Sequence, residues 1–192
     1  MTKNISILVL LFCCLTFFIS INCAKQEKTN GTTVQTPVTS SSNVAEVTAV
    51  MLKPNLAPNF TWKDASGKQV DFESFRGKVT LLNFWATWCG PCKRELPDLI
   101  ALSKELADKN IKIIGVSVDR SSDVLNSVKS FSDEHGIPYQ IVIANDELVQ
   151  AFGNVYAIPT SFVIDQQGKI AQTLVGMRSK EAIAQALTST LQ

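Results

Sequence analysis

The sequence predicts an α/β domain, because strand-like and helix-like segments alternate along most of its length. Two continuous apolar runs, residues 79–85 and 111–118, are typical of strands that are buried on both faces. Between these runs, Leu96, Leu99 and Leu106 recur at helical spacing. The pattern therefore predicts parallel strands connected by helices.

The other elements continue this alternation. A polar turn at residues 64–67 separates two short apolar segments and predicts a β-hairpin. Apolar spacing after residue 122 predicts a helix that ends near Gly136. Further strands are expected at residues 141–143, 161–165 and 170–175, and a closing helix is expected around Ile183, Ala186, Leu187 and Leu191.

The N-terminal segment has the order of a secretory signal, with an apolar run at residues 5–21 directly after Lys3. Cys23 follows the run and resembles the lipidated cysteine of a bacterial lipoprotein, although Ser20 and Asn22 depart from the usual residues before it. Cleavage at another position and an uncleaved anchor are the alternatives. We expect a lipoprotein-like signal peptide at residues 1–22 and lipid attachment at Cys23, which places the remaining chain outside the cytosol.

Residues 23–52 are rich in Ser, Thr, Asn and Gln and contain no aromatic side chain. Such a segment buries too little apolar area to offset the entropy lost on ordering. We therefore expect a flexible tether over residues 23–52, followed by a globular domain over residues 53–192.

The composition excludes several classes of function. The 192 residues include 18 Lys and Arg against 17 Asp and Glu, a formal net charge of +1. Nucleic-acid binding is not expected, because it needs a strongly basic face. The five cysteines are too few for a disulfide scaffold, and three of them, Cys13, Cys14 and Cys23, precede the domain.

The remaining two cysteines, Cys89 and Cys92, form a Trp-Cys-Gly-Pro-Cys motif between a predicted strand and a predicted helix. At a helix N-terminus, free backbone N–H groups and the helix dipole favour the thiolate of Cys89. Cys92 follows one turn later and is placed to attack a mixed disulfide on Cys89. We expect Cys89 to be the exposed nucleophile and Cys92 the buried resolving thiol.

Two other interpretations of the motif are weaker. A purely structural disulfide that closes so short a loop would stabilise the chain little. A zinc site needs further Cys or His ligands, and the one histidine, His135, lies at a predicted helix end. Redox chemistry without a metal or another cofactor is therefore the expectation.

Residues 84–93, Phe-Trp-Ala-Thr-Trp-Cys-Gly-Pro-Cys-Lys, closely resemble the thioredoxin superfamily. The segments 57–60, 75–79, 95–97 and 158–160 are similar to its TlpA/ResA-like branch, the extracytoplasmic thiol-disulfide oxidoreductases. The resemblance covers about residues 54–191. It implies a thioredoxin fold: a central mixed β-sheet flanked by helices, with an N-terminal β-hairpin and an inserted helix–strand unit at about residues 122–143.

The resemblance also implies roles for individual residues. Pro159 aligns with the family's cis-proline, which lies beside the cysteines. The backbone of Ile158 would pair with an extended substrate segment. Trp88 would cover the site. Asn83 stands where thioredoxin has a buried aspartate, so the branch's glutamate, here Glu95, would exchange protons with Cys92. Helical spacing places Glu95 on the same face as Cys92, but a solvated glutamate paired with a nearby cation is the alternative.

The expected activity is the reduction of protein disulfides in a bacterial cell envelope by a membrane-tethered monomer. The branch implies a membrane thiol carrier as electron donor and cytochrome c maturation, with apocytochrome c as substrate, as one role. The Gly90-Pro91 dipeptide is that of thioredoxin, whose potential is about −270 mV. The alternatives are a disulfide-donating oxidant, a peroxiredoxin-like peroxidase and a copper-binding module.

Overall fold

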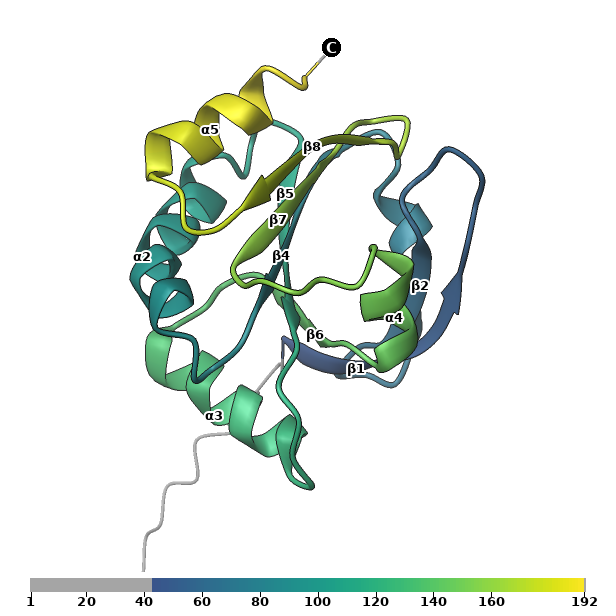
Figure 1. The fold of residues 1–192 in the computed structure, drawn as a ribbon, viewed down its shortest axis with the longest axis vertical. Helices are drawn as coiled ribbons and strands as arrows, with labels where there is room; N and C mark the ends of the chain where they lie inside the picture. The colour runs from purple at the N-terminus through teal and green to yellow at the C-terminus, as the bar shows by residue number, and fades with distance from the viewer. Residues whose placement is uncertain (1–42, 192) are drawn as a thin grey trace, which may run out of the picture. The chain divides into compact units, whose positions relative to one another are not determined.

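The computed structural model describes residues 43–191, so the predicted signal peptide, Cys23 and the first part of the predicted tether lie outside the described residues. Eight strands form one mixed sheet in the order β3-β2-β1-β6-β5-β4-β7-β8. Helices α2, α3 and α5 cover one face, and α4 lies on the other face (Figure 1). The elements are β1 (Val44–Met51), β2 (Asn59–Lys63), β3 (Gln69–Asp71), η1 (Phe72–Phe75), β4 (Val79–Trp85), α2 (Gly90–Glu105), β5 (Ile111–Ser117), α3 (Val124–His135), β6 (Gln140–Ile143), α4 (Asp146–Ala151), β7 (Thr160–Ile164), β8 (Ile170–Val175) and α5 (Lys180–Thr188).

Strand β4 lies near the middle of the sheet and positions the cysteine motif. It pairs in parallel with β5 and antiparallel with β7, and all seven of its residues are buried. The continuous apolar run that predicted this strand is explained by cores on both faces. Because the strand ends at Trp85, the loop that carries Cys89 emerges at the carboxyl edge of the parallel strands.

The predicted hairpin is confirmed, since β2 and β3 pair antiparallel around the turn at residues 64–67. The helix end predicted near Gly136 is also confirmed, because Gly136 caps α3 with a left-handed φ of 60°. The inserted unit corresponds to α3 and β6, and β6 pairs in parallel with β5. The sheet and its helices therefore have the thioredoxin-like arrangement that the sequence predicts.

Strand β1 is a correction to the predicted tether. Residues 44–51 do not belong to a free segment, because β1 pairs in parallel with β6 and antiparallel with β2. Val44, Ala45 and Val47 are buried in this strand. The polar Thr48 lies at an irregularity in the β1–β2 ladder, where its hydroxyl bonds the Thr61 carbonyl oxygen at 3.1 Å. Residues 44–51 therefore form part of the sheet, although they precede the predicted start of the domain at residue 53.

No helix among residues 43–191 is both long and apolar enough to cross a bilayer.

Candidate active site

Cys89 and Cys92 form a disulfide at the start of α2, with their Cα atoms 5.3 Å apart. Cys89 is the N-cap residue of this helix, and its sulfur accepts a hydrogen bond from the Cys92 N–H at 3.2 Å. Pro91 fits the first turn because a backbone N–H there would have no helical acceptor. The Cys92 N–H that bonds the sulfur in the disulfide is placed to stabilise a Cys89 thiolate after reduction.

Both sulfur-bearing residues are buried, with 4% of Cys89 and 5% of Cys92 exposed. The expectation of an exposed Cys89 is therefore wrong for the disulfide state. The Cys89 sulfur faces the loop before β7, and it lies 3.8 Å from the carbonyl oxygen of Ile158. Both cysteines belong to the hydrophobic core on the α2 side of the sheet, so the redox centre is continuous with that core.

The loop before β7 brings Ile158 and Pro159 to the disulfide. The peptide bond between them is cis, as the resemblance implies. The Pro159 carbonyl oxygen accepts a hydrogen bond from Gly176 N–H at 2.8 Å, which joins this loop to the end of β8. Trp88 is 68% exposed and is therefore not a core packing residue.

Glu95 is 3% exposed and lies one turn after Cys92 in α2. One carboxylate oxygen accepts a hydrogen bond from Arg178 N–H at 2.8 Å, and the other accepts one from the Asn83 amide at 3.1 Å. The Asn83 amide also donates to the Ser161 hydroxyl at 2.9 Å. Burial raises the pKa of Glu95, and the hydrogen bonds from Arg178 and Asn83 lower it less. The alternative of a solvated glutamate with a cation partner does not describe this side chain.

The geometry accords with comparisons to known proteins. A sequence model of the AhpC/TSA family matches residues 55–173. The chain belongs to the AhpC/TSA family. Its curated relatives include the thiol-disulfide oxidoreductase ResA of Geobacillus thermodenitrificans (strain NG80-2), which is 37% identical over 145 residues, 75% of this chain and 80% of the relative.

Solved structures support the same assignment. A thiol:disulfide interchange protein of the thioredoxin family from Chlorobium tepidum TLS is 35% identical, with a TM-score of 0.65 over 73% of this chain and 99% of that one. An exposed lipoprotein thioredoxin from Streptococcus pneumoniae strain TIGR4 is 27% identical, with a TM-score of 0.58 over 68% of this chain and 98% of that one. This AhpC/TSA family member is therefore a thiol-disulfide oxidoreductase of the ResA/TlpA type, with a CxxC disulfide and a thioredoxin-like fold.

Asp119 is a residue of this AhpC/TSA family member that the sequence analysis missed. It follows β5 and is 8% exposed. Its carboxylate accepts hydrogen bonds from the Thr87 N–H at 3.0 Å, the Thr87 hydroxyl at 2.6 Å and the Ser117 hydroxyl at 2.9 Å. Asp119 thereby fixes the loop two residues before Cys89. An aspartate directly after an apolar strand run was the available signal.

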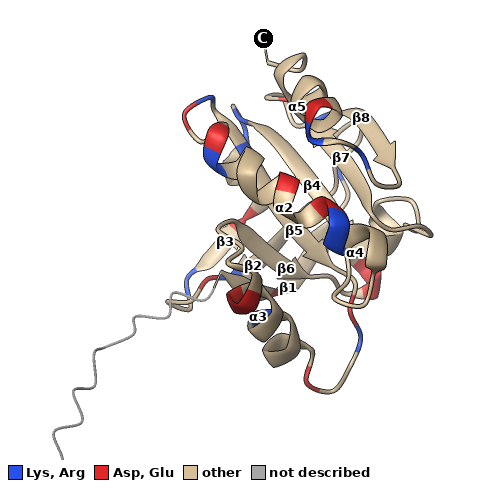
Figure 2. Ribbon diagram, turned by 90° about the vertical axis from the view of Figure 1, so that its left-hand side faces the viewer, with Lys and Arg blue, Asp and Glu red and all other residues tan. Residues whose placement is uncertain are grey.

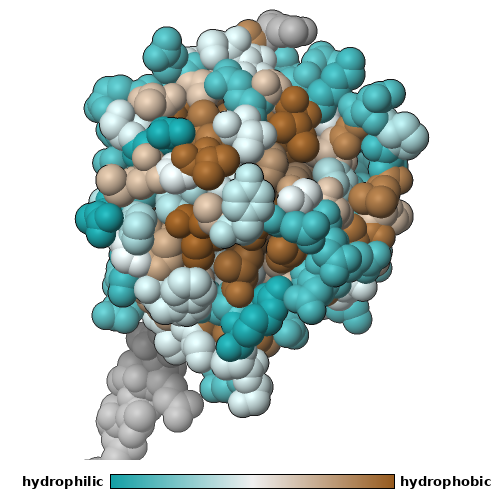
Figure 3. Space-filling view, in the orientation of Figure 1, coloured by the Kyte–Doolittle hydropathy of each residue, from teal (hydrophilic) through white to brown (hydrophobic). Residues whose placement is uncertain are grey.

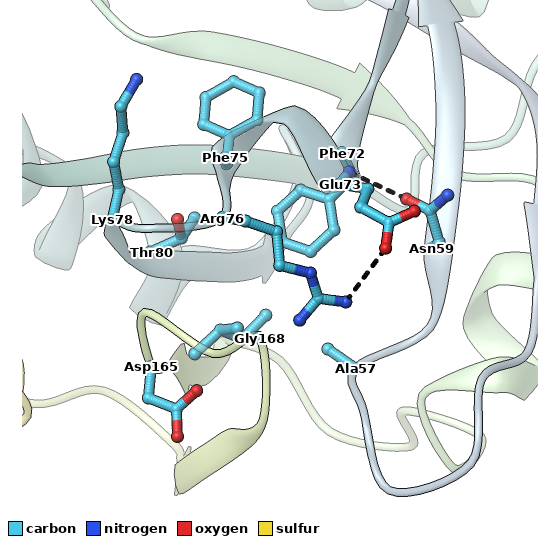
Figure 4. A pocket seen from close by; sticks show the side chains of 11 residues that line it. Ala57, Asn59, Phe72, Glu73, Phe75, Arg76, Lys78, Thr80, Asp165 and Gly168 are labelled. Carbon is cyan, nitrogen blue, oxygen red and sulfur yellow. Dashed lines mark hydrogen bonds and ion pairs between the residues drawn. The ribbon is translucent and has the colours of Figure 1, made fainter.

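A small cavity lies apart from the disulfide, between η1 and the turn that joins β7 to β8 (Figure 4). Its volume is about 10 Å³, which holds at most one water molecule. Glu73 bonds Asn59 through its N–H and pairs with Arg76, while the Arg76 guanidinium lies against Gly168. This cavity is a packing feature and not a ligand site.

Within residues 43–191, no three or more His, Cys, Asp or Glu side chains are grouped so that they could hold a metal ion.

Proposed function

We propose that the protein reduces disulfides of other proteins outside the cytosol, through the Cys89/Cys92 dithiol. The observation that carries this proposal is the disulfide at the N-terminus of α2, beside the Ile158 carbonyl and within one turn of the buried Glu95 carboxyl. The thioredoxin dipeptide Gly90-Pro91 supports the reducing direction, since thioredoxin has a potential of about −270 mV.

The reaction begins with the reduced protein. The Cys89 thiolate attacks one sulfur of the substrate disulfide; the substrate S–S bond breaks and its other sulfur leaves as a thiolate that takes a proton. Cys92 then loses its proton to the Glu95 carboxylate and attacks the Cys89 sulfur. The second substrate sulfur leaves, and the Cys89–Cys92 disulfide forms, so that two electrons have passed to the substrate.

Substrate binding is assigned to the loop that faces the Cys89 sulfur. An extended substrate segment would pair with the backbone of Ile158, while Pro159 offers no competing N–H to the sulfurs. Trp88, with its exposed indole, would cover the bound segment. Buried Glu95 serves as the group that exchanges a proton with Cys92.

The cellular setting is proposed on the N-terminal sequence and on the relatives. A signal peptide at residues 1–22, with Cys23 as lipid attachment site, would tether the domain to the outer face of a membrane. The pneumococcal relative, described as an exposed lipoprotein, supports this placement. A membrane thiol carrier would then restore the dithiol, and apocytochrome c is a candidate substrate.

Trapping and potentiometry test the proposal together. The Cys92→Ser variant, incubated with oxidised protein substrates, should hold a mixed disulfide on Cys89, whereas the matched Cys89→Ser variant should hold none. The full-length protein, equilibrated with redox buffers in detergent, should have a potential below about −230 mV. A value near about −120 mV would instead identify a disulfide donor.

A further inference from the structure

Three chain segments lie around the disulfide, and hydrogen bonds connect them. The loop before α2 carries Cys89, whose sulfur faces the Ile158 carbonyl. The loop before β7 is joined to residues 175–178 through the bond between Pro159 and Gly176. Residues 175–178 return to α2 through the bond from Arg178 N–H to Glu95. We call the surface formed by residues 86–94, 153–159 and 175–178 the redox face.

The redox face exposes large apolar side chains. Trp88 is 68% exposed, Tyr156 92%, Val175 46% and Met177 45%. Figure 3 shows apolar residues, coloured brown, gathered over β8 and the segment between α4 and β7. Exposed aromatic and apolar side chains around a reactive centre are typical of a protein-binding surface.

The charges of the redox face have one sign. Lys93, Arg94 and Arg178 are exposed, and residues 86–94, 153–159 and 175–178 contain no Asp or Glu. The Arg94 guanidinium lies close to Gly90, since a Cβ atom there would be 3.7 Å from it. Basic residues are visible in blue at the N-terminal end of α2 (Figure 2).

None of these three cations forms an ion pair with any residue between 43 and 191, whereas other cations of this part of the chain do. Lys180 pairs with Glu105, and Arg120 pairs with Asp146. The Glu95 carboxyl accepts a hydrogen bond from the Arg178 backbone N–H, but it is buried and does not lie at the surface of the redox face. The redox face thus combines an apolar centre with unpaired positive charge.

We propose that the redox face binds extended protein segments whose disulfide is flanked by acidic residues. This inference rests on the proposed function and adds the substrate class to it. Acidic side chains beside the substrate cysteines would meet Lys93, Arg94 and Arg178, while neighbouring apolar side chains would contact Trp88 and Tyr156. Complementary charge raises the rate of encounter and disfavours basic partners.

The test compares two peptides that share one disulfide and differ in flanking residues, which are Asp and Glu in the first and Lys in the second. The full-length reduced protein is used in neutral detergent. We expect kcat/KM for the acidic peptide to exceed that for the basic peptide by about tenfold at low salt. This ratio should fall toward one as salt screens the charges.

Two triple variants locate the effect. Lys93→Gln/Arg94→Gln/Arg178→Gln should bring the ratio close to one. The matched control, Lys63→Gln/Lys109→Gln/Lys169→Gln, removes the same charge from exposed lysines outside the redox face and should keep the full ratio. The ratio is independent of any change in Cys89 reactivity, because both peptides meet the same thiolate.

A small uncharged disulfide, bis(2-hydroxyethyl) disulfide, separates the two levels of the proposal. Failure to reduce it would overturn the proposed function itself. If the protein reduces this small disulfide but reduces the acidic and basic peptides at equal rates at low salt, only the substrate class is overturned. The same holds if the control variant loses the peptide ratio as fully as the redox-face variant does. Stronger sedimentation of the protein with anionic vesicles than with neutral ones, lost in the Lys93→Gln/Arg94→Gln/Arg178→Gln variant and accompanied by a peptide ratio of one, would identify the redox face as a membrane-binding surface and would also overturn the substrate class.

Discussion

Glu95, beside the redox centre, makes the stability of the fold depend on pH. Its carboxyl is buried, and its pKa is raised above the ordinary value of 4.5. The folded state therefore holds the Glu95 proton more tightly than the unfolded state. Its contribution to stability is fully present below pH 4.5 and is lost as pH rises through the raised pKa.

The Glu95→Gln variant tests this linkage. Between about pH 4.5 and the raised pKa of Glu95, the free energy of unfolding of the wild type should fall relative to that of the variant. Urea unfolding at a series of pH values measures the difference. A constant difference across this range would show that Glu95 has an ordinary pKa. The variant should also accumulate mixed disulfide on Cys89, since Cys92 loses its proton acceptor.

Asp119 acts as a positioning residue, because it holds the Thr87 backbone without touching the disulfide. Asp119→Ala leaves the donors of half-buried Thr87 and buried Ser117 without acceptors, which should cost about 1–3 kcal/mol of stability. We also expect Cys89 of the reduced variant to react more slowly with iodoacetamide, because its sulfur moves away from the helix N-terminus that stabilises the thiolate. The alkylation rate of the reduced protein at a fixed pH measures this loss, and Asp108→Ala, at an exposed position, is the control.

At the scale of elements, the long segments could be predicted and the short ones could not. Residues 79–85 and the helix around Leu96 and Leu99 carry enough apolar residues to show their period. Helix α4 spans only Asp146–Ala151, too short to show a helical period, and it was missed. Strand β1 was missed because its buried Val and Ala residues stand in a Ser- and Thr-rich context that resembles a linker.

The correction at β1 leads to a truncation experiment. A chain that starts at residue 43 retains β1, whereas one that starts at residue 53 loses the strand between β2 and β6. Burial of Val44 and Val47 stabilises the fold by about 1.5–3 kcal/mol for each side chain. The shorter chain should therefore unfold at a clearly lower temperature, measured by circular dichroism. Equal unfolding temperatures would show that residues 44–51 do behave as a tether.

The catalytic pair and the burial of Cys92 could be predicted from the motif, but the burial of Cys89 could not. The Trp-Cys-Gly-Pro-Cys spacing indicates a helix N-terminus by local rules. Ile158, which faces the Cys89 sulfur, lies 69 residues after Cys89 in the sequence. Arg178, which bonds Glu95, lies 83 residues after Glu95. Patterns in local sequence do not reveal contacts over such separations. The partners of Asn83 and Asp119 were hidden for the same reason.

At the scale of the whole molecule, the sheet separates two hydrophobic cores, and the disulfide belongs to the core that α2 and α5 cover. A redox change at Cys89 and Cys92 therefore alters the stability of the fold. The reduction potential of the disulfide in the folded protein can be compared with its potential in the unfolded chain. For each 30 mV by which the folded value is lower, the free energy of unfolding of the oxidised protein exceeds that of the reduced protein by about 1.4 kcal/mol.

The reducing function thus predicts that the oxidised protein is more stable than the reduced protein. Guanidinium unfolding of the full-length chain, with and without reductant, should show a higher midpoint for the oxidised form. The double variant Cys89→Ser/Cys92→Ser should give one midpoint under both conditions, which excludes a direct effect of the reductant. A strong oxidant gains its potential because its reduced form is stabilised, so a higher midpoint for the reduced protein would reverse the proposed direction of electron flow.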